Sequence, residues 1–176
     1  MKSLNISYHA LLQFLSSHTN IEGLRMIVYI DMDDVLCDFT GAKNRINSQY
    51  PQMGFPQSQF DFYRRLEPLN GAISSVESLI ASSEYDPYIL TAPSIHNPMS
   101  YTEKRVWIEE KFGFHFVEKL IICSNKGLLK GRYLIADNLE GHGQNMFEGE
   151  LIHFGSARFP GWASVLKYLR IDTSIL

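Results

Sequence analysis

Short apolar runs, each followed by polar residues, recur along this chain of 176 residues. They predict strands at 26–31, 87–91, 119–123, 132–136 and 150–153. Amphipathic stretches predict helices at 73–82, 101–112 and 161–170. Strands that alternate with helices are typical of a parallel sheet with helices on both faces. The pattern therefore predicts the α/β class, with a Rossmann-like parallel sheet flanked by helices.

The interval between the first two predicted strands, residues 35–85, is too long for an ordinary crossover between parallel strands. We expect it to form a small helical cap over the strand ends. It carries a group of aromatic side chains: Phe39, Tyr50, Phe55, Phe60, Phe62 and Tyr63. Some of them must pack the interior of the cap, because aromatic residues are usually buried. For the group as a whole, stacking against a nucleobase is a further role.

An acid pair follows the first predicted strand, where Asp31 and Asp33 come directly after the apolar run Met26–Ile30. Residues i and i+2 of a strand point to the same face, so the two carboxylates can converge. Adjacent carboxylates repel each other unless a cation or a proton intervenes. Hard oxygen ligands suit Mg²⁺, whose coordination shell a phosphate often completes. The alternative is a solvated acidic turn, because short motifs of this kind recur freely.

Three further predicted strands each carry, at or just beyond the carboxyl end, a polar residue that could bind a ligand or a metal. These residues are Thr91, Lys126 and Asp137. Alone, each has an ordinary structural alternative as a local cap, a surface charge or the start of a turn. In open α/β sheets, however, ligands bind beyond the carboxyl ends of the strands. We therefore expect acid, hydroxyl, amine and acid to meet at one edge of the sheet.

In this order, the residues resemble the haloacid dehalogenase-like phosphatases, and the surrounding segments resemble their 5′(3′)-deoxyribonucleotidase family. The matching segments are Asp31-Met32-Asp33 with Val35-Leu36 and Asp38-Phe39, Leu66-Glu67-Pro68-Leu69 with Gly71-Ala72, Leu90-Thr91-Ala92-Pro93, Lys104 with Trp107 and Phe112-Gly113, Asn125-Lys126, and Leu134-Ile135-Ala136-Asp137. They span about residues 26–138. The resemblance implies a haloacid dehalogenase-like core at 26–34 and 86–176, with a helical cap inserted at 35–85.

Residues 1–25 precede the resemblance, which begins at Met26. They contain one amphipathic helical candidate, from Tyr8 to Leu15. We interpret this segment as an N-terminal extension. Whether it belongs to the native protein, or Met26 is the true translation start, is left open.

The resemblance implies a Mg²⁺-dependent phosphomonoesterase that hydrolyses deoxyribonucleoside monophosphates through an aspartyl phosphate. Asp31 would attack phosphorus, and Asp33 would protonate the leaving oxygen and later activate water. Mg²⁺ would be held by the Asp31 carboxylate, the Asp33 main-chain carbonyl and Asp137. The implied phosphate contacts come from Thr91, the Ala92 amide and Lys126, and the implied base contacts from Phe39 and Phe62.

Three departures from the family pattern matter for this interpretation. Asp34 stands where Gly is common and adds a carboxylate beside the metal, although Asp tolerates a left-handed backbone better than most residues. Ala136 replaces the first of two acids before the last metal ligand, and Asn138 follows where a basic residue is common. Loss of such an outer carboxylate is expected to weaken metal binding roughly tenfold or more. Ala92 lacks a hydroxyl that some relatives carry, but it keeps its amide.

Lys104 and the two cysteines are less specific candidates. Lys104 lies with Trp107 on the helix predicted at 101–112, where a surface role is at least as well supported as a phosphate contact. Cys37 and Cys123 suggest neither a disulfide framework nor a zinc site, and we interpret both as structural. The histidines show no metal-ligand spacing, although His142 follows the last motif.

Composition mainly excludes partners. The net charge is −3 and basic residues cluster only in pairs, which argues against binding of a nucleic acid polymer. No apolar run approaches the roughly 18 residues of a membrane span and no signal peptide opens the chain, so we expect a cytoplasmic protein with no membrane partner. The expected partner is a small phosphoester.

Two other classes fit part of the pattern. A receiver-type signalling domain also combines acids, Thr and Lys, but it has no long cap after its first strand. A protein that binds a phospho-ligand without turnover would explain Asp34 and Ala136, whereas retention of both Asp31 and Asp33 favours an enzyme. A phosphatase for another small phosphoester is the alternative within the enzyme class. Base preference, 5′ against 3′ phosphate and oligomeric state are left open.

Overall fold

The core of the protein is a parallel sheet of five strands in the order β3-β2-β1-β4-β5. The computed structural model describes residues 25–172, so the helical candidate Tyr8–Leu15 lies outside the described residues. The strands are β1 (Met26–Ile30), β2 (Tyr85–Thr91), β3 (Leu120–Ile122), β4 (Tyr133–Ala136) and β5 (Glu150–His153). Each overlaps a predicted strand, with ends that differ by two residues at most. The predicted α/β class with a parallel sheet flanked by helices is confirmed.

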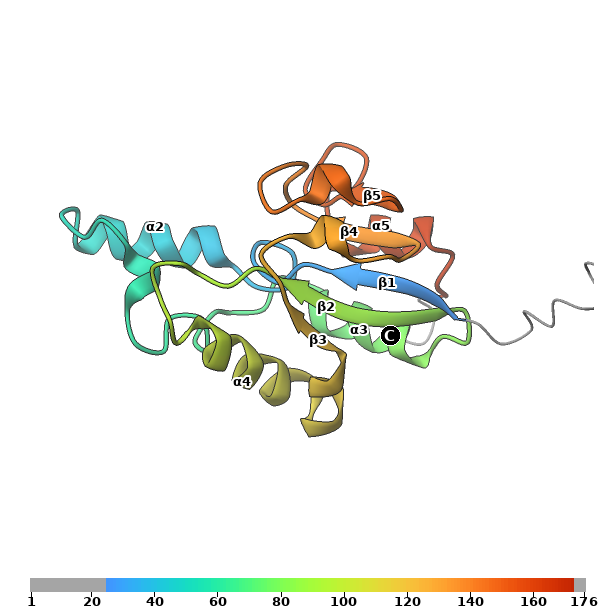
Figure 1. Cartoon of the computed structure of the whole chain (residues 1–176), viewed down its shortest axis with the longest axis horizontal. Helices are drawn as coiled ribbons and strands as arrows, with labels where there is room; N and C mark the ends of the chain where they lie inside the picture. Colours follow the sequence, from blue (N-terminus) through green and yellow to red (C-terminus); the bar gives the residue numbers. More distant parts are fainter. Residues whose placement is uncertain (1–24, 173–176) are drawn as a thin grey trace, which may run out of the picture.

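The central position of β1 explains its almost wholly apolar sequence. Neighbouring strands β2 and β4 pair with it on both sides, which leaves little of it in contact with water. Its side chains alternate between two core clusters: Val28 and Ile30 belong to the larger one and Tyr29 to the smaller one. Figure 1 shows β1 between β2 and β4.

The helices are α2 (Phe39–Gln49), α3 (Ala72–Ala81), α4 (Ser100–Phe112) and α5 (Trp162–Tyr168), with short 3-10 helices η1 (Pro56–Ser58), η2 (Phe114–Lys119), η3 (Lys126–Leu128) and η4 (Gln144–Met146). Helices α3, α4 and α5 contribute Val76, Trp107 and Val165 to the larger cluster. The smaller cluster contains Phe147, directly after η4. Among residues 25–172, no helix is long and apolar enough to cross a membrane.

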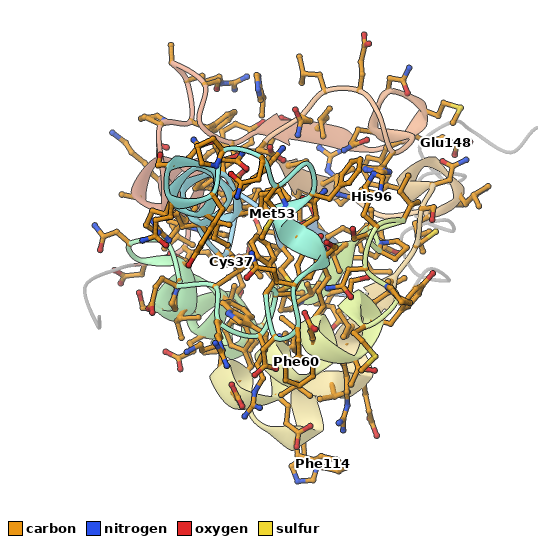
Figure 2. All side chains as sticks on the ribbon, turned by 90° about the vertical axis from the view of Figure 1, so that its left-hand side faces the viewer. Cys37, Met53, Phe60, His96, Phe114 and Glu148 are labelled. Atoms are coloured by element: carbon orange, nitrogen blue, oxygen red, sulfur yellow. The ribbon has the colours of Figure 1, made fainter. Side chains whose placement is uncertain are left out.

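The inserted interval 35–85 divides into two parts. Helix α3 packs with the core, since Val76 and Leu79 lie in the larger cluster. Helix α2 and η1 instead lie beyond the carboxyl end of β1, where Figure 1 shows α2 pointing away from the sheet. Figure 2 looks at the molecule from this side. We call residues 39–66 the cap.

The chain enters and leaves the cap through two short paired segments, residues 36–38 and 67–69, which we call the stem. The Asp38 amide donates to the Glu67 carbonyl at 2.9 Å, and the Leu69 amide to the Leu36 carbonyl at 2.8 Å. Cys37 pairs antiparallel with Pro68 between them. Leu36 and Cys37 are fully buried in the larger cluster. Because the stem is part of the core, it fixes the base of the cap above the strand ends.

Candidate active site

A cavity of about 550 Å³ opens at the carboxyl ends of β1, β2 and β4, between the core and the cap. Its lining residues are Asp31, Asp33, Asp34, Phe39, Thr40, Gln57, Tyr63, Ala92, Pro93, Ser94, Ile95, Lys126, Asp137, Asn138, His142 and Gln144. The acids, the lysine and one aromatic residue of the expected site therefore face one space. Thr91 and Phe62, which were expected at the substrate, are not among the lining residues.

Asp31, directly after β1, forms an ion pair with Lys126. The Lys126 ammonium donates to Asp31 Oδ2, and the Met32 amide donates to Asp31 Oδ1 at 2.8 Å. The Lys126 side chain is only 1% exposed, and its amide donates to the His142 carbonyl at 2.7 Å. Lys126 begins η3, whose preceding Asn125 accepts a hydrogen bond from the Gly127 amide. The loop after β3 thus holds a buried positive charge against the first carboxylate.

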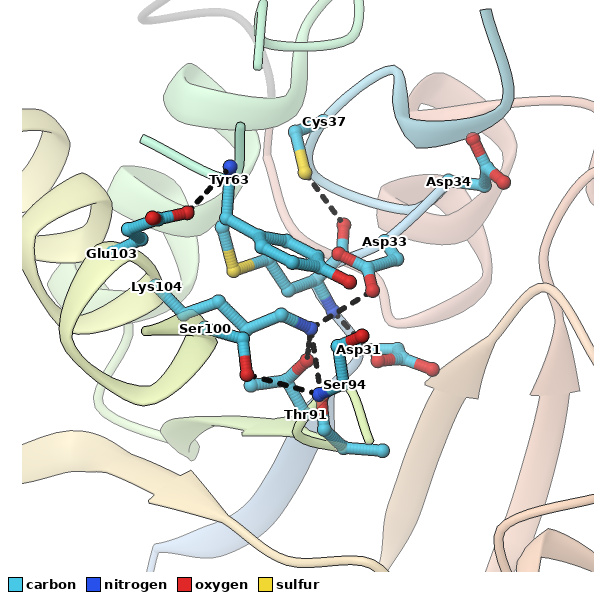
Figure 3. Close-up of polar contacts among 12 residues, drawn as sticks. Asp31, Asp33, Asp34, Cys37, Tyr63, Thr91, Ser94, Ser100, Glu103 and Lys104 are labelled. Carbon is cyan, nitrogen blue, oxygen red and sulfur yellow. Dashed lines mark hydrogen bonds and ion pairs between the residues drawn. The ribbon is translucent and has the colours of Figure 1, made fainter. Parts of the chain in front are cut away.

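Asp33 has a different lysine partner, Lys104 of α4. The Lys104 ammonium donates to Asp33 Oδ2 at 2.8 Å, to Thr91 Oγ1 at 2.7 Å and to the Ala92 carbonyl at 2.8 Å (Figure 3). An ammonium has three N–H groups, so this network uses all of them. Lys104 is 0% exposed, and the surface role that the sequence suggested for it is wrong.

The signal that could have placed Lys104 inside the protein is its spacing. Lys104, Trp107 and Ile108 are separated by three and four residues, and all three are buried on one face of α4. A lysine on the apolar face of a helix must direct its charge to a buried partner. The Lys104 ammonium also lies 4.8 Å from the centre of the Tyr63 ring.

The environment of Asp33 favours the protonated form of its carboxyl group. Burial raises the pKa of Asp33, Lys104 opposes that rise, and the charge of Asp31 adds to it. Asp33 Oδ1 is buried and has no hydrogen-bond partner in the described part of the chain. A carboxyl group with a raised pKa and a free oxygen is suited to exchanging a proton with a ligand.

Asp137, directly after β4, faces two other carboxylates. Burial and the charges of Asp31 and Asp34 raise its pKa to about 6. Asn138 Nδ2 donates to Asp137 Oδ2 at 2.7 Å. Carboxylates that raise one another's pKa in this way are stabilised by a cation between them.

The donor set fits a hard divalent cation. Within residues 25–172, no group of three or more His, Cys, Asp or Glu side chains is arranged to hold a metal. The expected set, however, needs only the carboxylates of Asp31 and Asp137 together with the Asp33 main-chain carbonyl. These are all oxygen ligands, and Mg²⁺ commonly takes one or two carboxylates and completes its shell with waters and phosphate.

The first departure from the family pattern, Asp34, has a structural explanation. Its φ of 55° is in the left-handed region that Gly usually occupies. Its Oδ1 accepts from the Thr40 amide at 2.8 Å, and its Oδ2 accepts from the Thr40 hydroxyl at 2.5 Å. Asp34 thus helps Asp38, whose side chain accepts from the Gly41 amide, to cap the start of α2. The Asp34 side chain connects the loop after β1 to the cap.

The aromatic wall of the cavity comes from Phe39 and Tyr63. These rings are stacked, with centroids 6.0 Å apart and an interplanar angle of 20°. Phe62 packs edge-on against both, at 5.7 Å from Phe39 and 5.2 Å from Tyr63. Phe62 therefore supports the wall from behind, and the cavity is lined instead by Tyr63, which the sequence placed only in the aromatic group of the cap. Phe62 and Tyr63 are adjacent in the sequence but their side chains point in different directions, which the sequence alone does not show.

Buried Glu103 of α4 fixes this wall to the core. It accepts hydrogen bonds from the amides of Asp61 and Tyr63, both at 3.0 Å. Asn97 Nδ2 donates to Glu103 Oε2 at 3.4 Å and to the Gln57 carbonyl at 2.9 Å. Glu103 and Asn97 thus hold the main chain of the cap at Tyr63 and Gln57.

Comparison with known proteins identifies the family. The family model described as 5′ nucleotidase, deoxy (Pyrimidine), cytosolic type C protein matches residues 53–167. A protein of Vibrio phage KVP40, whose name assigns it provisionally as a 5′(3′)-deoxyribonucleotidase, is 37% identical over 81% of this chain and 84% of its own length. This chain belongs to the 5′ nucleotidase, deoxy (pyrimidine), cytosolic type C family.

More distant members of the family agree. The mouse mitochondrial 5′(3′)-deoxyribonucleotidase is 27% identical over 69% of this chain and 67% of its own length. The Bacillus subtilis 5′(3′)-deoxyribonucleotidase is 28% identical over 72% of this chain and 68% of its own length. The predicted resemblance to this nucleotidase family is confirmed, and with it the prediction of a hydrolase that acts on phosphomonoesters.

Cys37 lies near Asp33 but is buried in the core. Its thiol donates to the Met32 carbonyl at 3.4 Å inside the larger core cluster. Burial and the nearby Asp33 raise the pKa of this thiol well above its usual value, so it is neutral at physiological pH. Both cysteines are free in the structure.

Proposed function

We propose that this protein is a Mg²⁺-dependent 5′(3′)-deoxyribonucleotidase that hydrolyses deoxyribonucleoside monophosphates through a phosphoenzyme on Asp31. The observation that carries the proposal is that the two aspartates have different lysine partners and different environments. Asp31 pairs with Lys126 inside the cavity, whereas Asp33 has a raised pKa and an oxygen without a partner. One carboxylate is thus suited to attack and the other to proton transfer.

In the first half of the reaction, an Asp31 carboxylate oxygen attacks phosphorus and the bond to the leaving sugar oxygen breaks. Protonated Asp33 donates its proton to that oxygen, so that the nucleoside leaves as a neutral alcohol. Lys126 keeps its positive charge beside Asp31 and can contact the phosphoryl oxygens. The Thr91 hydroxyl accepts from Lys104 and thereby helps to hold the ammonium beside Asp33.

In the second half, deprotonated Asp33 takes a proton from water, and the resulting hydroxide attacks phosphorus and releases Asp31. Asp33 then carries the proton for the next cycle. Phe39 and Tyr63 bound the cavity on the cap side and offer ring faces to a nucleobase.

The Asp31 and Asp137 carboxylates and the Asp33 carbonyl would hold Mg²⁺. When bound, the ion offsets negative charge on the phosphate and on the two carboxylates, so that an anionic nucleophile can approach an anionic ester. The raised pKa of Asp137 supports this assignment, because a bound cation would offset both of its causes, which are burial and the charges of Asp31 and Asp34.

The test is phosphate release from a panel of deoxy- and ribonucleoside monophosphates and sugar phosphates, with Mg²⁺ or with chelator. We expect turnover with Mg²⁺, preference for the deoxyribonucleotides, and loss of activity by a factor of about 10⁴ or more in Asp31→Asn, since the nucleophile is removed. Asp86→Asn is the matched control, because Asp86 bonds to Lys119 outside the cavity. Nucleotide binding without any phosphate release would instead indicate a phospho-ligand-binding protein.

A second measurement tests the two half-reactions. Asp33→Asn removes both the acid and the base, but p-nitrophenyl phosphate has a leaving group that needs no proton. This variant should therefore release one equivalent of p-nitrophenol rapidly and then stall as the phosphoenzyme, which mass spectrometry would detect on Asp31. A linear time course without a burst would contradict the covalent route.

A further inference from the structure

We infer that Gln57 reads the hydrogen-bonding edge of the nucleobase and thereby determines which phosphomonoesters this enzyme prefers. The inference rests on the proposed function, because it takes a nucleotide as the substrate. It starts from two atoms. In residues 25–172, the buried side-chain oxygen or nitrogen atoms without a hydrogen-bond partner are Asp33 Oδ1 and Gln57 Oε1, and both residues line the same cavity.

A buried acceptor without a partner has lost its hydrogen bond to water and gained nothing in exchange. For Asp33, the bound substrate supplies the partner, since the proposed mechanism places the leaving oxygen there. Gln57 belongs to η1 in the cap, whereas Asp33 follows β1. The Gln57 amide is therefore free for the part of the substrate that reaches the cap, which is the base.

Other amide side chains in or near this cavity already form hydrogen bonds within the protein. Gln144 Oε1 accepts from the His142 amide at 2.7 Å. Asn97 Oδ1 accepts from the Met99 amide at 2.8 Å, and its Nδ2 donates to the Gln57 carbonyl. Asn138 bonds to Asp137. Among these four amides, Gln57 is the one whose oxygen is buried and unpaired.

The main chain of Gln57 is held in place before any ligand binds. The Asn97 side chain, which is 3% exposed, bonds to the Gln57 carbonyl and to Glu103. Next to Gln57, the Phe55 ring stacks on His96 with centroids 3.8 Å apart and an interplanar angle of 20°. Figure 2 labels His96 on the face that it shows. Two links to the 92–99 loop thus fix the main chain around Gln57.

The chemistry of the ligand follows from the amide group. Oε1 needs a hydrogen-bond donor, and each nucleobase offers one on its Watson–Crick edge, as a ring N–H or as an exocyclic amino group. The Gln57 amide can accept from that N–H and donate to a neighbouring acceptor of the same edge. A sugar phosphate carries its hydroxyl donors on the sugar itself and has no base that extends from the sugar toward the cap. Gln57 thus favours nucleotides over small phosphoesters that lack a base.

The test is Gln57→Leu, which keeps the approximate volume and removes both polar atoms. We compare kcat/KM for thymidine 5′-monophosphate with kcat/KM for the baseless 2-deoxyribose 5-phosphate. The ratio should fall about tenfold, since one hydrogen bond is lost, while the rate on the baseless ester stays the same. Gln52→Leu is the matched control, because Gln52 is exposed in the same cap and does not line the cavity.

A second readout separates recognition from a structural role. Gln57→Leu removes an unpaired buried acceptor, so its midpoint of urea unfolding should equal or exceed that of the native protein. A structural glutamine would lower that midpoint instead and overturn the inference.

The native enzyme gives a test that needs no variant. Two modified substrates lack the N–H group from which Gln57 Oε1 would accept a hydrogen bond. They are thymidine 5′-monophosphate methylated at N3 and deoxycytidine 5′-monophosphate dimethylated at N4. Both should react about tenfold more slowly than their parents, and equal rates in both pairs would overturn the inference. A native enzyme that does not prefer nucleotides to the baseless ester would overturn the proposed nucleotide substrate as well. A preference that Gln57→Leu retains would overturn the role of Gln57 alone.

Discussion

Asp31 and Asp33 lie two residues apart in the sequence, yet each carboxylate has its own lysine. Lys126 arrives from the loop after β3 and Lys104 from α4, and both are almost completely buried. A single lysine between the two acids would have favoured the charged form of both. With separate partners, burial can raise the pKa of Asp33 while Asp31 keeps a counter-ion.

We expect Lys104 to lower the pH at which Asp33 exchanges its proton, against the larger effect of burial. Lys104→Met removes the charge that opposes the effect of burial, so the pKa of Asp33 should rise further. Water activation requires deprotonated Asp33, and the acidic limb of the kcat profile should therefore move to higher pH by about one unit or more. Lys130→Met, at a side chain that is 86% exposed, is the control and should leave the profile unchanged. An unmoved acidic limb in Lys104→Met would rule out this role.

We expect Asp137, as a proposed metal ligand, to couple metal binding to pH. Its carboxyl group has a pKa of about 6, so it is protonated below that pH and must lose its proton to bind a cation. The Mg²⁺ concentration for half-maximal activity should therefore rise about tenfold for each pH unit below 6 and level off above it. Calorimetric titration of Mg²⁺ at several pH values measures this directly, and proton release on binding should be about half a proton at pH 6 and approach one proton below it. Affinity that is independent of pH between 5 and 7 would contradict the assignment.

At the scale of elements, the strand ends explain why much of the proposed site could be read from the sequence. Thr91, Lys126 and Asp137 each end or follow a strand, and a parallel sheet brings all carboxyl ends to one edge. Helix α4 behaves differently. Lys104 and Glu103 act on groups from the loop after β1 and from the cap, and no local pattern reveals those partners. Orientation within the cap, which separates Tyr63 from Phe62, depends on packing in the same way.

Glu103 connects α4 to the aromatic wall of the cavity. Glu103→Ala would leave the buried amides of Asp61 and Tyr63 unpaired and should cost about 2–4 kcal/mol of unfolding free energy. Because Tyr63 lines the cavity, KM for nucleotides should rise more than kcat falls. Urea unfolding and steady-state kinetics measure the two effects. Glu110→Ala is the control, since the exposed pair of Glu110 with Arg64 should contribute little to stability.

At the scale of the whole molecule, the cap and the core share one interior. Leu36 and Phe62 of the insertion belong to the same buried cluster as Ile30 of β1 and Trp162 of α5. Two indoles of the core bridge it to the insertion 35–85: Trp107 Nε1 donates to the Leu66 carbonyl at 2.7 Å, and Trp162 Nε1 donates to the Val35 carbonyl at 2.9 Å. A cap with its own hydrophobic core could move away from the sheet independently. Here, such a movement would expose the buried side chains of the stem to water.

We therefore expect cap and core to unfold together. Tryptophan fluorescence reports on the two bridges, far-ultraviolet circular dichroism reports on all helices including α2, and the two urea transitions should coincide. Trp162→Phe leaves the Val35 carbonyl unpaired, which should cost about 1–3 kcal/mol and lower Tm by roughly 2–10 °C. Both probes should shift by the same amount in this variant. A fluorescence change that precedes the loss of helix signal would instead show a cap that opens before the sheet unfolds, and the stem would then act as a hinge and not as part of the core.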